Sequence, residues 1–218
     1  MRLNINISAS LLAAVSTAML LGSCAKWTKP ESLDFRRSFI ENENKEAYDA
    51  YLNNIREYKN SEHKLMFLTM KGISDKPFSQ SQHLMAMPDS ADYICLRVDG
   101  ELNEIIASEV AEVREKKGTK SLLLLDYAPI HEAWGLLEDE RADKGQAPGT
   151  KEELIAFFKE QTEARLAACN KYGLDGLMVT FLGNTSNEYA LNSHVAYMNA
   201  IKDFHKANPD KILAFRGT

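Results

Sequence analysis

The sequence predicts an α/β fold in which helices cover a parallel β-sheet, and three observations lead to this class. Short apolar runs alternate along the chain with longer segments of helical periodicity. The runs are apolar on both faces, which is typical of parallel strands buried between layers of helices. Of the 218 residues, 44% are hydrophobic and 26% are charged, a balance that supports a core and excludes a wholly disordered chain.

Five short runs, rich in aliphatic and aromatic side chains, are predicted to form the strands of this sheet. They lie at residues 65–68, 92–98, 122–125, 177–182 and 212–215. We expect all five to be buried. Their carboxyl ends are expected near Lys71, Asp99, Asp126, Leu182 and Arg216.

Four segments have the periodicity of amphipathic helices. They include residues 43–60, 102–113, 154–168 and 191–204. Thr150 and Glu153 form a T-x-x-E capping box, which predicts the start of the third helix because each side chain satisfies a free amide of the other residue. Pro209 predicts the end of the fourth helix, since proline cannot continue a helical hydrogen-bond pattern.

Repeated β/α units leave two common architectures, a closed barrel or an open doubly wound sheet. A dinucleotide-binding sheet carries G-x-G-x-x-G after its first strand, whereas residues 71–73 of this chain read Lys-Gly-Ile. A P-loop is absent as well. The glycine pattern therefore favours a (β/α)8 TIM-barrel type of fold, of which only the first five or so units are present.

Residues 1–23 are predicted to be a lipoprotein signal peptide. Arg2 supplies a positive charge, and the apolar stretch 11–21 is too short for a membrane span but suits a signal sequence. Residues 21–24, Leu-Gly-Ser-Cys, resemble a bacterial lipobox, and the resemblance implies cleavage before Cys24 and attachment of lipid to its sulfur. An ordinary secretory signal followed by a chance cysteine is the alternative.

The remaining chain is expected to contain a tether and one domain. Residues 24–40 would be the lipidated Cys24 and its tether, and residues 41–218 the partial barrel. The lipid would anchor the protein to a membrane, which we expect to be the bacterial outer membrane or the cell surface. Which leaflet it faces stays open.

The charge balance and the cysteines exclude several other functions. The net charge is −5, so no basic surplus exists for a nucleic-acid partner. Cys95 and Cys169 lie in an apolar run and on a predicted helix, which indicates small buried hydrophobic residues. We expect no metal and no cofactor. Four further histidines are scattered along the chain, and we expect the three that lie on polar stretches to be solvated. The four are His63, His83, His194 and His205.

Residues 172–182 carry the most informative pattern. They read YGLDGLMVTFL and resemble the fourth strand of family 18 glycoside hydrolases, the chitinases and endo-β-N-acetylglucosaminidases, whose motif is D-G-x-D-x-D-x-E. Positions two apart on a strand point the same way, so the motif's acids line a barrel interior. The resemblance covers roughly residues 34–218.

The resemblance also shows what this chain has lost. When Asp175 and Gly176 are aligned with the motif, its second and third aspartates are Met178 and Thr180, and its general acid is Leu182. The family's third strand usually ends in S-x-G-G, where residues 126–129 here read Asp-Tyr-Ala-Pro. The family's substrate-assisted hydrolysis needs those acids, so we predict no catalytic residue and no enzymatic activity.

The resemblance implies a lipid-anchored, non-catalytic protein that captures glycans for uptake, with an outer-membrane glycan importer as a possible partner. The implied ligands contain N-acetylglucosamine, as N-glycans and chitin-like oligomers do. Aromatic and planar polar side chains after the predicted strand ends are the candidate contacts: Asp126, Tyr127, Trp134, Asn184 and Tyr189. Trp134 lies in a long polar segment, 129–149, which we expect to be a binding loop or lid. A short helix at residues 132–144 is the alternative.

Two other functions stay open. An endo-β-N-acetylglucosaminidase with relocated acids would use Asp126, Glu132 and Glu188, which all lie near predicted strand ends, because other glycosidases employ paired carboxylates. A truncated, non-functional fragment of a barrel is the third possibility.

Overall fold

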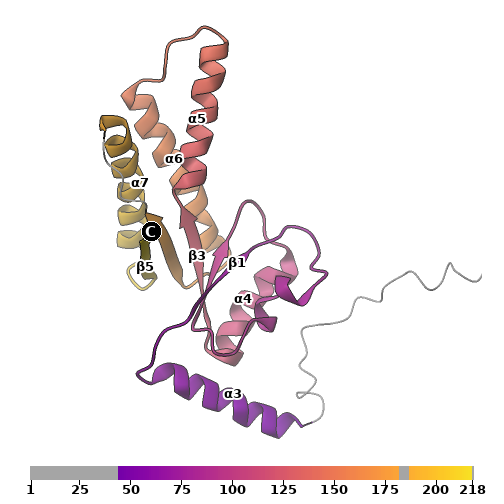
Figure 1. The fold of residues 1–218 in the computed structure, drawn as a ribbon. Helices are drawn as coiled ribbons and strands as arrows, with labels where there is room; N and C mark the ends of the chain where they lie inside the picture. Colours follow the sequence, from indigo (N-terminus) through magenta and orange to yellow (C-terminus); the bar gives the residue numbers. More distant parts are fainter. Residues whose placement is uncertain (1–43, 182–186, 218) are drawn as a thin grey trace, which may run out of the picture. The chain divides into compact units, whose positions relative to one another are not determined.

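The computed structural model describes residues 44–181 and 187–217, and it confirms the α/β class (Figure 1). One sheet of five strands has the order β1-β2-β3-β4-β5, and all neighbouring strands are parallel. The strands are β1 (Phe67–Lys71), β2 (Tyr93–Arg97), β3 (Lys120–Asp126), β4 (Gly176–Phe181) and β5 (Ile212–Gly217). A sheet whose spatial order follows the sequence is of the barrel type, since a doubly wound sheet reverses its order.

Helices connect the strands in the β/α alternation that the sequence predicts. They are α3 (Lys45–Asn60), α4 (Glu104–Lys117), α5 (Ala128–Asp143), α6 (Lys151–Lys171) and α7 (Glu188–Ala207), with short 3-10 turns η1 (Gln80–Gln82) and η2 (Leu84–Ala86). The capping box at the start of α6 is confirmed. Glu153 N donates to Thr150 Oγ1 at 3.2 Å, and Thr150 N donates to Glu153 Oε2 at 3.0 Å.

The sheet has two chemically different faces. The outer face packs on the helices and contributes Leu96, Leu123 and Val179 to the main core. The inner face has a smaller apolar cluster, in which Cys95, Leu122 and Met178 are buried. Because side chains alternate along a strand, every second residue from these three also lies on the inner face.

Two sequence expectations about the elements are wrong. The first strand starts at Phe67 rather than residue 65, and Leu65, Met66 and Phe67 are exposed, because β1 has a paired neighbour on only one side in the described sheet. The loop expected at 129–149 is also wrong, whereas its alternative, a short helix at residues 132–144, is confirmed in longer form as α5. Its apolar side chains Ile130 and Trp134 are four residues apart and buried, a helical period that the many charged neighbours hide.

The expectation of solvated histidines is also wrong for most of them. His63 Nε2 lies 2.8 Å from Asp92 Oδ1, and His83 Nδ1 lies 2.5 Å from Glu109 Oε1. Both pairs are largely shielded from water, and His194 is buried too. These histidines stabilise the packing of loops and helices rather than meeting solvent.

Candidate ligand sites at the carboxyl ends of the strands

The inner face ends in a group of polar side chains, which we call the strand-end cluster: Lys71, Arg97, Asp126, Thr180 and Arg216. Register places them in two rows at the carboxyl ends of the strands. Lys71 pairs with Arg97 across β1 and β2, and Asp126, Thr180 and Arg216 form one row across β3, β4 and β5. In barrels of this kind the carboxyl ends of the strands hold the ligand.

Asp126 is the centre of the strand-end cluster. Arg97 Nη2 donates to Asp126 Oδ2 at 3.1 Å, and Thr180 Oγ1 donates to Asp126 Oδ1 at 2.6 Å. Arg97 Nε also lies 3.7 Å from Asp99 Oδ1. Both oxygens of Asp126 therefore accept hydrogen bonds from neighbouring strands.

The residues of the D-G motif have structural roles at the other end of β4. Asp175 Oδ2 accepts a hydrogen bond from Ser121 N at 2.8 Å, and its Oδ1 lies 2.6 Å from Arg114 Nε. A Cβ on Gly176 would meet the Ile212 carbonyl oxygen at 2.1 Å, so only glycine lets β5 approach β4 this closely. The position of Leu182 lies outside the described residues.

Tyr127 lies in the layer between sheet and helices and not at a surface. Its side chain is 5% exposed, and its ring stacks on Phe158 with centroids 5.4 Å apart. The hydroxyl is 2.7 Å from Ser193 Oγ, and burial raises the pKa of Tyr127. This environment gives Tyr127 a packing role between α5, α6 and α7, and its contact with a glycan stays a prediction.

Trp134 and Tyr189 share a pocket of about 350 Å3, which we call the Trp134–Tyr189 pocket. Its other lining residues come from α5, α6, α7 and the segment before α6: Glu138, Pro148, Gly149, Thr150, Lys151, Leu154, Glu188 and Asn192. Tyr189 is 37% exposed, whereas Trp134 is only 3% exposed. Trp134 packs on Phe157, with ring centroids 5.3 Å apart.

The structure brings Trp134 and Tyr189 to one pocket, but the polar-loop environment expected for Trp134 is wrong. The residue is not in a polar loop; it lies on the buried side of α5, where the indole fills space against α6. Of the other predicted contacts, Asp126 is in the strand-end cluster, and Asn184 lies outside the described residues.

A salt bridge closes one side of the Trp134–Tyr189 pocket. Lys151 Nζ lies 3.0 Å from Glu188 Oε1 and joins the first turns of α6 and α7. The hydrogen bond from Lys151 lowers the pKa of the Glu188 carboxyl. Burial raises the pKa of Tyr189 to about 12, so the phenol stays neutral near neutral pH.

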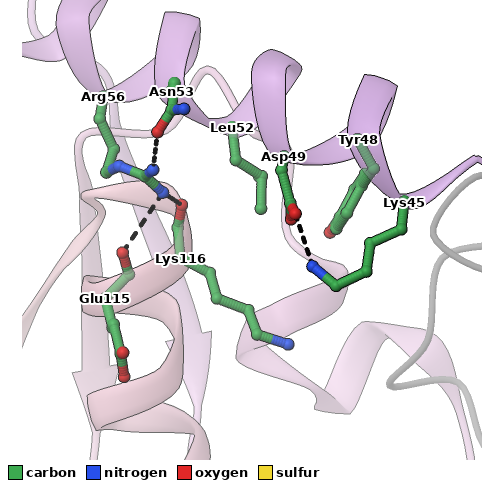
Figure 2. A pocket seen from close by; sticks show the side chains of 8 residues that line it. All are labelled: Lys45, Tyr48, Asp49, Leu52, Asn53, Arg56, Glu115 and Lys116. Carbon is green, nitrogen blue, oxygen red and sulfur yellow. Dashed lines mark hydrogen bonds and ion pairs between the residues drawn. The ribbon is translucent and has the colours of Figure 1, made fainter.

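A second pocket, of about 560 Å3, lies between α3 and the end of α4 (Figure 2). Its charged groups bind one another. Lys45 pairs with Asp49 at 2.5 Å, and Arg56 Nη1 donates to the carbonyl oxygen of Lys116 at 2.5 Å. A cation at the carboxyl end of a helix stabilises it, so these contacts attach α3 to α4, and we assign no ligand to this pocket.

Two other kinds of site are absent from the part of the chain that the structure describes. No three His, Cys, Asp or Glu side chains gather there as metal ligands. Within residues 44–181 and 187–217, no helix has the length and apolar character needed to cross a membrane.

Sequence reasoning missed the two arginines of the strand-end cluster as functional candidates. Arg97 lies inside a predicted strand, and Arg216 ends one. Both are two residues beyond inner-face positions, Cys95 and Ala214. The two-residue spacing can be seen in the sequence, but the sequence alone does not show which face of the sheet is the inner one.

Parallel β/α units in sequential order, with polar side chains gathered where the strands end, define a (β/α) barrel class of protein. The comparisons narrow this class. The model for glycoside hydrolase family 18, BT1044-like, matches residues 28–218, and the chain belongs to this family.

Solved structures share the fold. An endo-β-N-acetylglucosaminidase from Cordyceps militaris is 20% identical, with a TM-score of 0.50 over 77% of this chain and 54% of the other. A variant of BT1044 is 19% identical, with a TM-score of 0.52 over 83% of this chain and 59% of the other. The chain thus spans little more than half the length of these two proteins. No protein of curated function matches it.

Proposed function

We propose that the chain binds glycans without hydrolysing them. The observation that supports this most strongly is the strand-end cluster, where Asp126 is held between Arg97 and Thr180. Thr180 stands where the family motif has an aspartate, and Met178 fills the inner apolar cluster where the motif has another. The inner face keeps the family's layout but carries different chemistry.

Hydrolysis requires a side chain that donates a proton to the glycosidic oxygen. Asp126 accepts hydrogen bonds from Arg97 and Thr180 on its two oxygens and is thereby held in the strand-end cluster. Glu188 is tied to Lys151, and its pKa is lowered, whereas a general acid needs a raised pKa. Glu132, the third acid of the alternative, is exposed on α5. The contacts of Asp126 and Glu188 thus support binding rather than hydrolysis.

The Trp134–Tyr189 pocket supports the binding half of the proposal. Small-molecule sites combine aromatic walls with a few convergent polar groups, and here Tyr189 is accompanied by Asn192 and Glu138. A sugar ring can stack its C–H face on Tyr189 and bond its hydroxyls to the polar side chains. The endo-β-N-acetylglucosaminidase with the same fold suggests a ligand that contains N-acetylglucosamine, as N-glycans and chitin-like oligomers do.

The proposed place of action follows from the amino-terminal segment. A lipid on Cys24 would hold the protein at a membrane, which we propose is the bacterial outer membrane or the cell surface. Capture of glycans there would serve a glycan importer. Labelling of cells with a radioactive fatty acid tests the lipid, because Cys24→Ser abolishes incorporation if Cys24 is the acceptor.

Calorimetric titration of the purified chain with a high-mannose N-glycan and with a chitin oligomer tests the function. We expect one of them to bind and to be recovered intact by mass spectrometry. Tyr189→Ala should weaken binding at least tenfold, about 1.4 kcal/mol. Leu191→Ala is the matched control, since Leu191 is also exposed on α7 but does not line the pocket.

Two results would overturn this proposal. Recovery of shortened sugar would show hydrolysis and direct attention to the acids of the alternative. Binding of neither glycan, nor of a sialylated or sulfated sugar, in a chain that unfolds cooperatively, would remove glycan binding itself.

A further inference from the structure

The strand-end cluster has an excess of positive charge in a protein whose net charge is −5. Lys71, Arg97 and Arg216 project from the ends of three strands onto the inner face. The family motif concentrates acids there, whereas among the described residues of this cluster only Asp126 is acidic. Among the described residues, the cluster therefore has three cations and one acid.

The two acidic side chains near the cluster already form ion pairs. Asp126 and Asp99 both pair with Arg97, at 3.1 Å and 3.7 Å. Within residues 44–181 and 187–217, neither Lys71 nor Arg216 has an ion pair. Both side chains are exposed, so their charges are accessible to a ligand from solvent.

The inner-face placement of Arg216 follows from the alternation of side chains along β5. Ala214, two residues earlier, packs against the inner apolar cluster, so Arg216 lies on the same face. The positive charge of Arg216 also opposes the rise in the pKa of the Cys95 thiol that burial causes. Thr180, the register partner of Arg216, adds a hydroxyl group beside it.

We propose that the strand-end cluster binds an anionic group of the glycan, a carboxylate or a sulfate ester on a sugar. An arginine offers paired N–H donors that match the oxygens of either group. Lys71 lies on the opposite edge strand and adds to the positive charge along the strand ends. Asp126 keeps Arg97 oriented and leaves Arg216 to contact the ligand. This inference rests on the proposed glycan binding and makes the ligand an acidic rather than a neutral oligosaccharide.

The test compares matched sugars on the purified chain. Calorimetry would use a sialylated N-glycan, the same glycan after removal of sialic acid, and a chitin oligomer with and without a sulfate ester. We expect one acidic sugar to bind at least tenfold more tightly than its neutral counterpart. Its affinity should fall as salt rises, because ion pairs at an exposed site are screened.

Variants assign the effect to the cluster. Arg216→Gln and Lys71→Gln should each reduce the acidic-over-neutral preference about fivefold or more. Lys120→Gln is the control, because Lys120 is an exposed cation at the opposite end of the sheet. Thermal unfolding of each variant verifies that it folds.

The outcomes separate this inference from the proposed function. Equal affinity for acidic and neutral sugars would overturn the inference and leave glycan binding standing. If Arg216→Gln and Lys71→Gln both keep the preference for the acidic sugar, the inference is also overturned, because another part of the chain would then bind the anionic group. Binding of none of the sugars would overturn both.

Discussion

Trp134 has the largest energetic consequence of the predicted site residues, because it lies in the core. Its side chain is 3% exposed and packs on Phe157 of α6. Trp134→Ala should therefore destabilise the protein by about 3–5 kcal/mol, the usual cost of removing a large buried ring. Urea unfolding measures this, with Leu136→Ala on the exposed side of α5 as control. A loss below about 1 kcal/mol would show that the ring is not a core residue.

His63 gives the stability a defined pH dependence. The hydrogen bond to Asp92 raises the pKa of His63, and the positive charge of Lys59 opposes the rise. A raised pKa in the folded state means that the stabilisation is complete below the unfolded pKa of about 6.5. It is lost as the pH rises through the folded value.

Denaturant unfolding across pH 5 to pH 9 checks this expectation. The stability difference between the native protein and His63→Gln should shrink as the pH rises above about 6.5. His205→Gln is the control, since His205 has no ion pair in the described part of the chain. A difference that is constant with pH would contradict the assignment.

These residues also show the limit of sequence reasoning at this scale. A charged neighbourhood predicts solvent for a histidine, and that prediction is wrong for His63 and His83 because Asp92 and Glu109 come from elsewhere in the chain to meet them. The position of Asp126 at a strand end was predictable from its own strand. Its partners Arg97 and Thr180 were not, because they depend on the register of three strands.

Capping motifs and hydrophobic periodicity predict the helices in which they occur. The capping box at Thr150 gives the start of α6, and the aliphatic spacing gives α4 and α7. Helix α5 buries only a narrow stripe of apolar side chains, and its Leu136 and Leu137 are exposed. Its hydrophobic periodicity is therefore weak. It forms because Ile130 and Trp134 find partners on neighbouring elements, which no local signal reveals.

The N-cap of α6 should contribute measurably to stability. Thr150 accepts the hydrogen bond from Glu153 N, and loss of such a cap costs about 1 kcal/mol. Thr150→Ala should lower the free energy of unfolding by this amount, and Thr150→Ser should restore most of it, because serine keeps the accepting oxygen. Equal losses for both variants would point to the methyl group instead of the cap. Equilibrium urea unfolding resolves the difference.

At the scale of the whole molecule, the order of the strands was predictable and the exposure of the edges was not. Alternating β/α units imply neighbouring parallel strands, and all five are found in that order. Burial on both faces was expected for every strand. In the described sheet β1 and β5 each have one neighbouring strand, and Phe67 and Phe215 are exposed. An edge strand is buried only where a further element packs against its free side.

The edges lead to a prediction for hydrogen exchange of the backbone amides. Every second amide of an edge strand points away from its only partner, whereas β3 bonds to β2 and β4 and is packed under α4 and α6. Amides of β3 should therefore exchange most slowly, and about half of those in β1 and β5 should exchange rapidly. Mass spectrometry at several protein concentrations provides the measurement. Slow exchange of β5 only at high concentration would mean that a second copy pairs with its edge, since an unpaired strand edge is a template for further pairing. Slow exchange at every concentration would mean that another part of the chain covers Phe215 and completes the sheet there.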